Sequence, residues 1–222
     1  MLRPHKKLRK KEIKEDALVT FYFRFQKWYT QYHRQIQIGL GILVALCVIA
    51  VLMARSKREA EAKASGKIGI AETYYLMGDY SRVIQEMEPI VKTYSGTRSA
   101  GIAAYYLGSA YYAQNRYAEA EKYFRMVVDH SPHMPLFSAS SLAGLAAIAE
   151  SKGDFKTAAK LYEKAGRKYS TLFTAPFYLK EAIRCYLRIQ NIEKAKMLSD
   201  EWIKKFPENP GMQEIQWLRE TL

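Results

Sequence analysis

The sequence predicts an all-α protein in which one membrane-spanning helix precedes a solenoid of about four helix pairs. Two observations lead to this fold class. A 17-residue run without a charged side chain lies near the N-terminus, and a pattern with a period of 37 or 38 residues fills most of the remaining chain. The 222 residues are enough for one domain with a sizeable core once the membrane segment is set aside.

The charge-free run extends from Ile38 to Ala54, between Arg34 and Arg55. As a helix it covers roughly 26 Å, close to the thickness of a bilayer core. A core helix of a soluble protein, the first alternative, normally carries a polar face, whereas this run is apolar all round. We therefore expect a transmembrane helix over residues 37–54.

A cleaved signal peptide is the second alternative for this run, with Ala62-Lys63-Ala64 as a small-residue cleavage site. The leader would then carry an unusually long charged N-terminal part. The basic residues that follow the run directly also disfavour this interpretation.

The distribution of charge predicts the orientation. Residues 1–37 hold ten Lys or Arg against three acidic residues, a net charge of +7, whereas the much longer remainder carries +6. The positive-inside rule then places the N-terminus in the cytoplasm and the residues after Ala54 across the membrane. The basic cluster from Arg55 to Lys67 acts in the opposite direction.

Two segments precede the predicted span. Residues 1–16 form a basic cytoplasmic tail without apolar periodicity, which we expect to be disordered or held on anionic lipid headgroups, with nucleic acid as the alternative ligand. Residues 17–36 carry large apolar side chains at helical spacing, namely Phe21, Phe25, Trp28, Tyr29, Tyr32 and Ile36. This pattern predicts an aromatic amphipathic helix at the membrane surface, and docking to a partner is the alternative.

Internal repetition begins after the span. Residues 55–66 contain strong helix formers and predict a helical stalk, and residues 67–222 predict the solenoid. Four segments align on a short turn and a second helix, and their corresponding positions are Val83, Ala120, Ala158 and Ala195. A fixed period of this size indicates stacked helix pairs. Residues 209–222 predict a final helix that caps the last pair.

The second pair carries a family resemblance. Its residues match the tetratricopeptide pattern in type and spacing at Leu107, Gly108, Tyr111, Ala120, Phe124 and Pro132. Gly108 and Ala120 are small, so that two antiparallel helices approach closely, while Tyr111 and Phe124 fill the space beside them and Pro132 ends the second helix. The resemblance implies a right-handed α-solenoid that packs through these residues and through Ala158 and Ala195.

Sequence patterns of catalysis do not occur: there is no glycine-rich phosphate loop, no GxSxG turn and no HExxH. Asp129, His130 and His133 are the one cluster that suggests metal ligands, and a polar turn around Pro132 explains them as well. Cys47 lies in the span and Cys185 far along the chain, so they cannot pair within one chain. We expect no catalytic residue, metal site or cofactor, and we do not expect an enzyme. Enzymatic activity is kept as an alternative to the two non-catalytic functions described below.

A binding surface is the function that remains. In tetratricopeptide proteins the first helix of each pair lines the concave side, and the resemblance places on that side Ile68, Tyr75, Tyr105, Tyr112, Phe177, Arg184 and Arg188. Aromatic and Arg side chains dominate binding hot spots. The Lys and Asn pattern by which some tetratricopeptide domains clamp an acidic C-terminus is absent, because Ile68 and Glu72 stand where the first pair would need it.

The complete layout, a basic tail, one N-terminal span and the repeats, is similar to the bacterial inner-membrane tetratricopeptide proteins that include the ancillary subunit of the Sec translocon. This resemblance implies a single-pass inner-membrane scaffold with a periplasmic C-terminal domain. Translocon subunits or periplasmic chaperones would be its partners, and no specific nucleic acid is expected. The alternative function is structural: a protein that self-associates as a homo-oligomer or links an envelope complex.

Overall fold

The computed structural model describes residues 10–222, with side chains from Val19 onward. These residues form nine α-helices and no strand, so the all-α prediction is confirmed. They divide into two compact units, a first that ends at Ser56 and a second from Lys57 to Leu222, and helix α1 (Lys10–Leu76) contributes to both.

The first unit contains the apolar run. None of its most apolar 18-residue window is buried, and the mean hydropathy of that window is 2.8. By length and composition this segment is able to cross a membrane, and a signal sequence near an N-terminus shares both properties. Helix α1 begins at Lys10, so residues 10–16 of the basic tail are helical and not disordered, while residues 1–9 of that tail lie outside the described residues.

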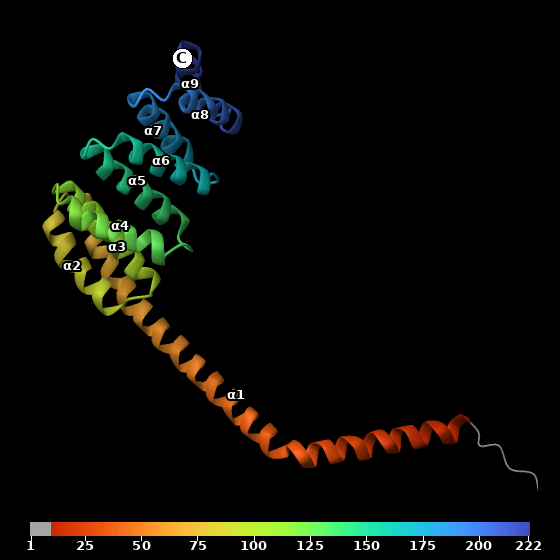
Figure 1. Ribbon diagram of the computed structural model, residues 1–222. Helices are drawn as coiled ribbons and strands as arrows, with labels where there is room; N and C mark the ends of the chain where they lie inside the picture. Colours follow the sequence, from red (N-terminus) through yellow and green to blue (C-terminus); the bar gives the residue numbers. More distant parts are fainter. Residues whose placement is uncertain (1–9) are drawn as a thin grey trace, which may run out of the picture. The chain divides into compact units, whose positions relative to one another are not determined.

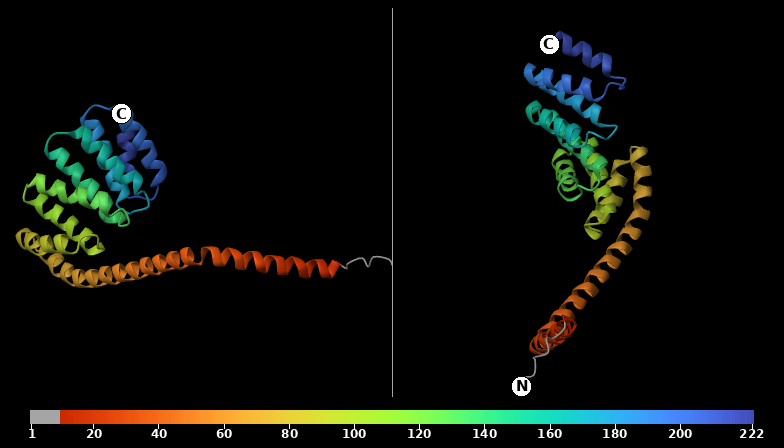
Figure 2. Two further views of the ribbon diagram at one scale, coloured as in Figure 1. Left: turned by 60° about the horizontal axis from the view of Figure 1, so that its bottom comes forward. Right: turned by 90° about the vertical axis from the view of Figure 1, so that its right-hand side faces the viewer.

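The second unit consists of four helix pairs and a final helix. The C-terminal part of α1 pairs with α2 (Tyr80–Thr93), α3 (Arg98–Ala113) with α4 (Tyr117–His130), α5 (Pro135–Ser151) with α6 (Phe155–Lys168), and α7 (Ala175–Arg188) with α8 (Ile192–Lys205). Helix α9 (Met212–Thr221) follows as the predicted capping helix. Helices α2 to α8 each contact the next helix along the chain, and Figures 1 and 2 show α2 to α9 stacked in that order.

The turn inside each pair repeats with the predicted period. One residue per turn has a left-handed backbone, and these residues are Gly78, Asn115, Gly153 and Gln190, with φ values of 76°, 58°, 77° and 59°. In three turns the next residue is Asp or Asn, whose side chain accepts a hydrogen bond from the first turn of the second helix: Asp79, Asp154 and Asn191. Each such cap satisfies a backbone N–H that the helix itself leaves free, which fixes where the second helix starts.

Small residues allow the helices to approach in the core. Val83, Ala120, Ala158 and Ala195, the corresponding positions of the four repeats, are all fully buried. The ring of Phe124 in α4 lies between α3 and α5, against a glycine on each side: a Cβ atom on Gly108 would be 2.7 Å from this ring, and one on Gly144 would be 2.6 Å from it. The two glycines therefore create the space that the aromatic ring fills.

The second unit begins earlier than the sequence predicts. Ala64, in the predicted stalk of residues 55–66, is fully buried. Glu61 accepts hydrogen bonds from the backbone N–H and the hydroxyl of Ser99, at 3.1 and 2.6 Å. Because Ser99 lies in the first turn of α3, Glu61 caps that helix from a distant part of the chain. The stalk prediction is therefore wrong for the part that includes Glu61 and Ala64.

The C-terminal end of the solenoid is closed by α8 and α9. Trp202 of α8 is buried and donates its indole N–H to the backbone carbonyl of Pro176 at 2.9 Å. Ile215 of α9 is buried in the same cluster. The final helix thus covers apolar surface that the last pair would otherwise expose, as terminal units of solenoids do.

We expect Gly108→Ala to lower the free energy of unfolding by about 1 to 3 kcal/mol, because the new methyl group meets the confined ring of Phe124. Gly69→Ala is the matched control: Gly69 also lies in a helix, but nothing lies within 4 Å of a Cβ atom there. That substitution should instead stabilise the protein, by about 0.5 to 1 kcal/mol. Urea unfolding of the full chain in detergent, followed by circular dichroism, measures both, and equal effects would contradict this packing.

Candidate functional site

The first helices of the pairs lie side by side and form one continuous surface. Tyr75 of α1 packs edge-on against Tyr106 of α3, with ring centroids 5.2 Å apart. Tyr105 of α3 meets Phe137 of α5 at 5.3 Å. The hydroxyls of Ser140 in α5 and Tyr178 in α7 are 3.0 Å apart. We call the partly exposed side chains of α1, α3, α5 and α7 on this surface the first-helix face.

The structure places six of the seven predicted binding residues at least partly on the surface. Phe177 is 58% exposed, and Arg184 and Arg188 are also exposed. Tyr75, Tyr105 and Tyr112 are half-buried among other aromatic rings. Ile68 is the exception: it is only 6% exposed and belongs to the core cluster around α3. Its assignment to a partner-binding surface is therefore wrong, because α2 and α3 cover it.

The part of the first-helix face that begins at α1 is rich in tyrosine. Burial raises the pKa of the Tyr106 phenol to about 12, and the nearby Glu72 carboxylate acts in the same direction. Burial likewise raises the pKa of Tyr75 and of Tyr105. These phenols therefore stay protonated near neutral pH and present apolar rings with hydroxyl tips.

The part formed by α7 is charged. Arg184 donates to Glu150 of α5 at 2.5 Å and to Glu181 of its own helix at 2.7 Å. Burial alone would lower the pKa of this guanidinium, but the hydrogen bonds to Glu150 and Glu181 outweigh burial and raise the pKa. Arg188, one turn further along α7, lies over the ring of Phe155, 5.5 Å from its centroid.

Helix α5 separates these two parts with small side chains. Its partly exposed positions on this side include Ser140, Ala143, Gly144 and Ala147. None of these residues was a predicted site residue. The sequence of α5 is rich in alanine and has few large or charged side chains on this side, so it predicts a helix but gives no sign of a binding surface. Their spacing of three and four residues is the signal that places them on one side of α5. Small side chains therefore lie between the tyrosines of α3 and the arginines of α7.

Comparison with known proteins identifies the architecture. The model of the tetratricopeptide repeat-like domain matches residues 26–175, more than half of the chain. The chain belongs to this family. None of the curated proteins matches the sequence significantly.

Solved tetratricopeptide structures resemble the chain in fold. Two crystal structures contain the nearly identical TPR-like repeats of a Podosopora anserina protein assigned as a kinesin light chain, one of them with a substitution. Both superpose with a TM-score of 0.56 and 19% identity over 70% of this chain, and cover 82% and 83% of the solved chains. At this identity the likeness shows the fold alone.

The predicted packing residues of the tetratricopeptide pairs lie where the family pattern requires. Tyr111 and Phe124 are each 3% exposed, between helices. Tyr111 also donates its hydroxyl to Glu88 of α2 at 2.7 Å, so its polar end is satisfied inside the fold. Pro132 is exposed in the turn two residues beyond the last residue of α4, His130, which is the expected place for a residue that cannot continue a helix.

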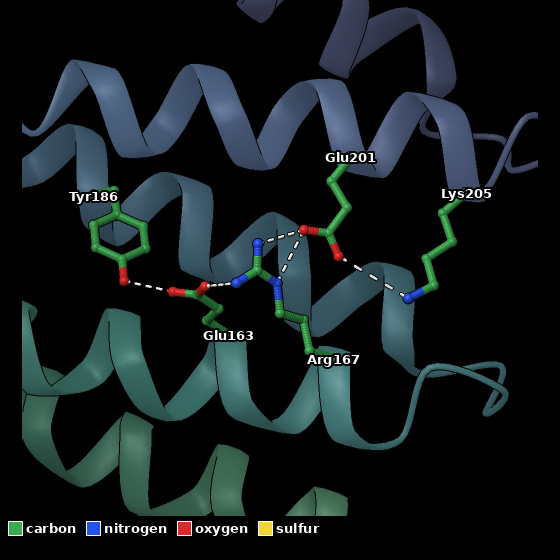
Figure 3. A network of polar contacts seen from close by, with 5 residues as sticks. All are labelled: Glu163, Arg167, Tyr186, Glu201 and Lys205. Carbon is green, nitrogen blue, oxygen red and sulfur yellow. Dashed lines mark hydrogen bonds and ion pairs between the residues drawn. The ribbon is translucent and has the colours of Figure 1, made fainter.

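Polar contacts on the other side of the tetratricopeptide unit are structural. Arg167 of α6 donates from Nε to Glu201 of α8 at 2.9 Å and also pairs with Glu163 of its own helix. Tyr186 of α7 donates to Glu163 at 2.6 Å, and Lys205 lies 4.0 Å from Glu201 (Figure 3). This network joins α6, α7 and α8, and its charges are compensated within the chain.

His130 and His133 line a cavity of about 380 Å³ beside the turns that follow α2 and α4. Among residues with described side chains, no three His, Cys, Asp or Glu side chains gather as metal ligands. Cys185 is fully buried, and burial raises the pKa of its thiol to about 12. A protonated, buried thiol is a poor nucleophile.

We expect Cys185 to be unreactive in the folded protein. Its raised pKa leaves roughly a thousandfold less thiolate at pH 8 than an unfolded chain would have, and burial blocks access as well. Ellman's reagent added to the Cys47→Ser variant in detergent should give slow labelling that becomes fast and complete in denaturant. Rapid labelling of the folded variant would contradict the burial of this thiol.

Proposed function

We propose that the chain is a membrane-anchored scaffold that holds other proteins through its tetratricopeptide unit. The observation that carries this proposal is the continuity of α1: the apolar run from Ile38 to Ala54 and the first helix of the first tetratricopeptide pair belong to one helix. The family match over residues 26–175 also includes both parts. An anchor built into the binding domain keeps that domain at the bilayer.

The distribution of charge supports an orientation with the N-terminus in the cytoplasm. Ten basic residues precede the apolar run, and cytoplasmic flanks of membrane spans are enriched in Lys and Arg. The tetratricopeptide unit would then work on the outer face of the cytoplasmic membrane. In this arrangement residues 17–36 lie at the membrane surface, where the exposed rings of Phe21, Phe25 and Trp28 sit among the lipid headgroups.

The partner class follows from this location and from the first-helix face. Secreted or envelope proteins leave the translocon on that side of the membrane, so translocon subunits and periplasmic chaperones are the proposed partners. The exposed aromatic and arginine side chains Phe177, Arg184 and Arg188 are of the types that contribute most to protein interfaces. The alternative function is self-association as a structural component of an envelope complex.

The proposed topology predicts that protease added to spheroplasts removes the tetratricopeptide unit and leaves an N-terminal tag intact. The physical reason is the excess of positive charge before the apolar run, which retains that end in the cytoplasm. Immunoblots against tags at both ends measure this. Lysis with detergent is the control and should expose the N-terminal tag. Protection of the C-terminal unit in intact spheroplasts would contradict the proposed topology.

Partner binding at the first-helix face predicts cross-links from Phe177. Replacing Phe177 by photoreactive benzoylphenylalanine keeps an aromatic side chain at an exposed position, so the fold should be unaffected. Illumination of cells should give adducts with translocon or chaperone proteins, identified by mass spectrometry. The same group at Lys164, an exposed residue of the second helix α6, is the matched control and should give few adducts.

The two functions give different adducts in this experiment. Adducts with other membrane or periplasmic proteins at Phe177 support the scaffold. An adduct of two copies of this chain supports the self-associating alternative. Equal labelling from Phe177 and Lys164 would show that the first-helix face is not the binding surface.

A further inference from the structure

A groove of about 660 Å³ lies between α7 and α9, where the first-helix face ends. Four aliphatic side chains line it, namely Ile183, Leu187, Ile215 and Leu218, and the ring of Phe155 adds a fifth apolar wall. The remaining lining is charged: Lys180, Arg184 and Arg188 from α7, and Glu214 from α9. The groove therefore combines an apolar interior with a mainly positive rim.

The rim charges differ in how far they are compensated within the chain. Lys180 pairs with Glu214 at 2.6 Å and so joins α7 to α9. Arg184 is held by Glu150 and Glu181. Arg188 forms no ion pair with any carboxylate whose side chain the structure describes, and its guanidinium lies over the ring of Phe155. One positive charge at the groove thus has no carboxylate partner within the described part of the chain.

This arrangement selects the chemistry of an occupant. An apolar side chain would cover the partly exposed Phe155, Leu187 and Leu218, and such burial is favourable in proportion to the area removed from water. A neighbouring carboxylate would supply the partner that Arg188 lacks, through a charge-assisted and often bidentate hydrogen bond. A basic segment would supply no partner for Arg188, the one rim cation that is not already paired with a carboxylate of the described chain.

We propose that the groove between α7 and α9 binds an acidic segment of a partner protein, in which an apolar side chain enters the groove and an adjacent carboxylate pairs with Arg188. This rests on the proposed function and names the chemical class of the segment that is bound. The occupant is a different protein rather than the tail of a second copy, because residues 1–16 carry seven Lys or Arg and only three acids. That tail carries an excess of positive charge, which the unpaired Arg188 repels.

A fluorescein-labelled ten-residue peptide of alternating leucine and aspartate tests this with the full chain in neutral detergent micelles. Fluorescence anisotropy gives the dissociation constant. We expect Arg188→Glu to weaken binding about tenfold or more, which corresponds to the loss of one charge-assisted pair. Lys164→Glu makes the same charge change on exposed α6, outside the groove, and should leave the dissociation constant within about twofold.

Two further measurements make the test specific. Glu214→Gln removes the one negative charge of the groove lining and frees Lys180, so it should tighten binding a few-fold. A peptide with lysine in place of aspartate should bind the wild-type chain at least about tenfold more weakly. Circular dichroism checks the fold of every variant, and Arg188→Gln replaces Arg188→Glu if the latter is unfolded.

The proposal is overturned if the wild-type chain does not bind the acidic peptide, if Arg188→Glu and Lys164→Glu behave alike, or if the lysine peptide binds equally well. If the peptide does not bind but Phe177 gives specific cross-links, the groove proposal is rejected and the scaffold function stands. If neither peptide binding nor specific cross-links are found, both proposals are rejected. Concentration-dependent displacement of the peptide by a second copy of the chain would assign the groove to self-association and also overturn the proposal.

Discussion

The close approach of neighbouring helices is the constraint on which the second unit depends. A helix pair has an apolar side that it cannot bury alone, so each pair needs the next pair to cover that side. Phe124 makes this dependence visible, because its ring belongs to one pair and fills space beside Gly108 in that pair and Gly144 in the next. The contact with Gly144 exists only when both pairs are in place.

This interlocking also builds the first-helix face. When the core fixes the separation of α3, α5 and α7, the sides of these helices that point away from the core come together as one surface. The composition of this face then follows from the side chains of these helices that are not buried in the core. Tyrosines remain on α3, small side chains on α5, and charged side chains on α7. The surface therefore changes along the unit from aromatic to charged.

Helix α9 contributes both to the stability of the second unit and to the proposed binding groove. It buries Ile215 against the last pair and thereby prevents an exposed apolar end. In the same position it supplies Glu214 and Leu218 to the groove beside α7. A capping helix thus serves as one wall of a site, in the place where a further first helix would stand in a longer solenoid.

The sequence by itself determined the helix pairs, their period and the apolar segment. These depend on local features: side-chain volume at Ala120 and Ala158, turn residues such as Gly78 and Gly153, and a run without charge, and each can be recognised within one stretch of chain. The family pattern also identified Gly108, Tyr111 and Phe124 as packing residues.

Only the tertiary structure decided which side chains are available to a partner. Ile68 was expected on the binding surface but is buried, because α1 presents that side to α2 and α3. Gly144, the cap of α3 by Glu61, and the groove beside Arg188 involve residues from different helices. Helical periodicity states which residues share a side of one helix, whereas exposure depends on what packs against that side, and this is set by contacts distant in sequence.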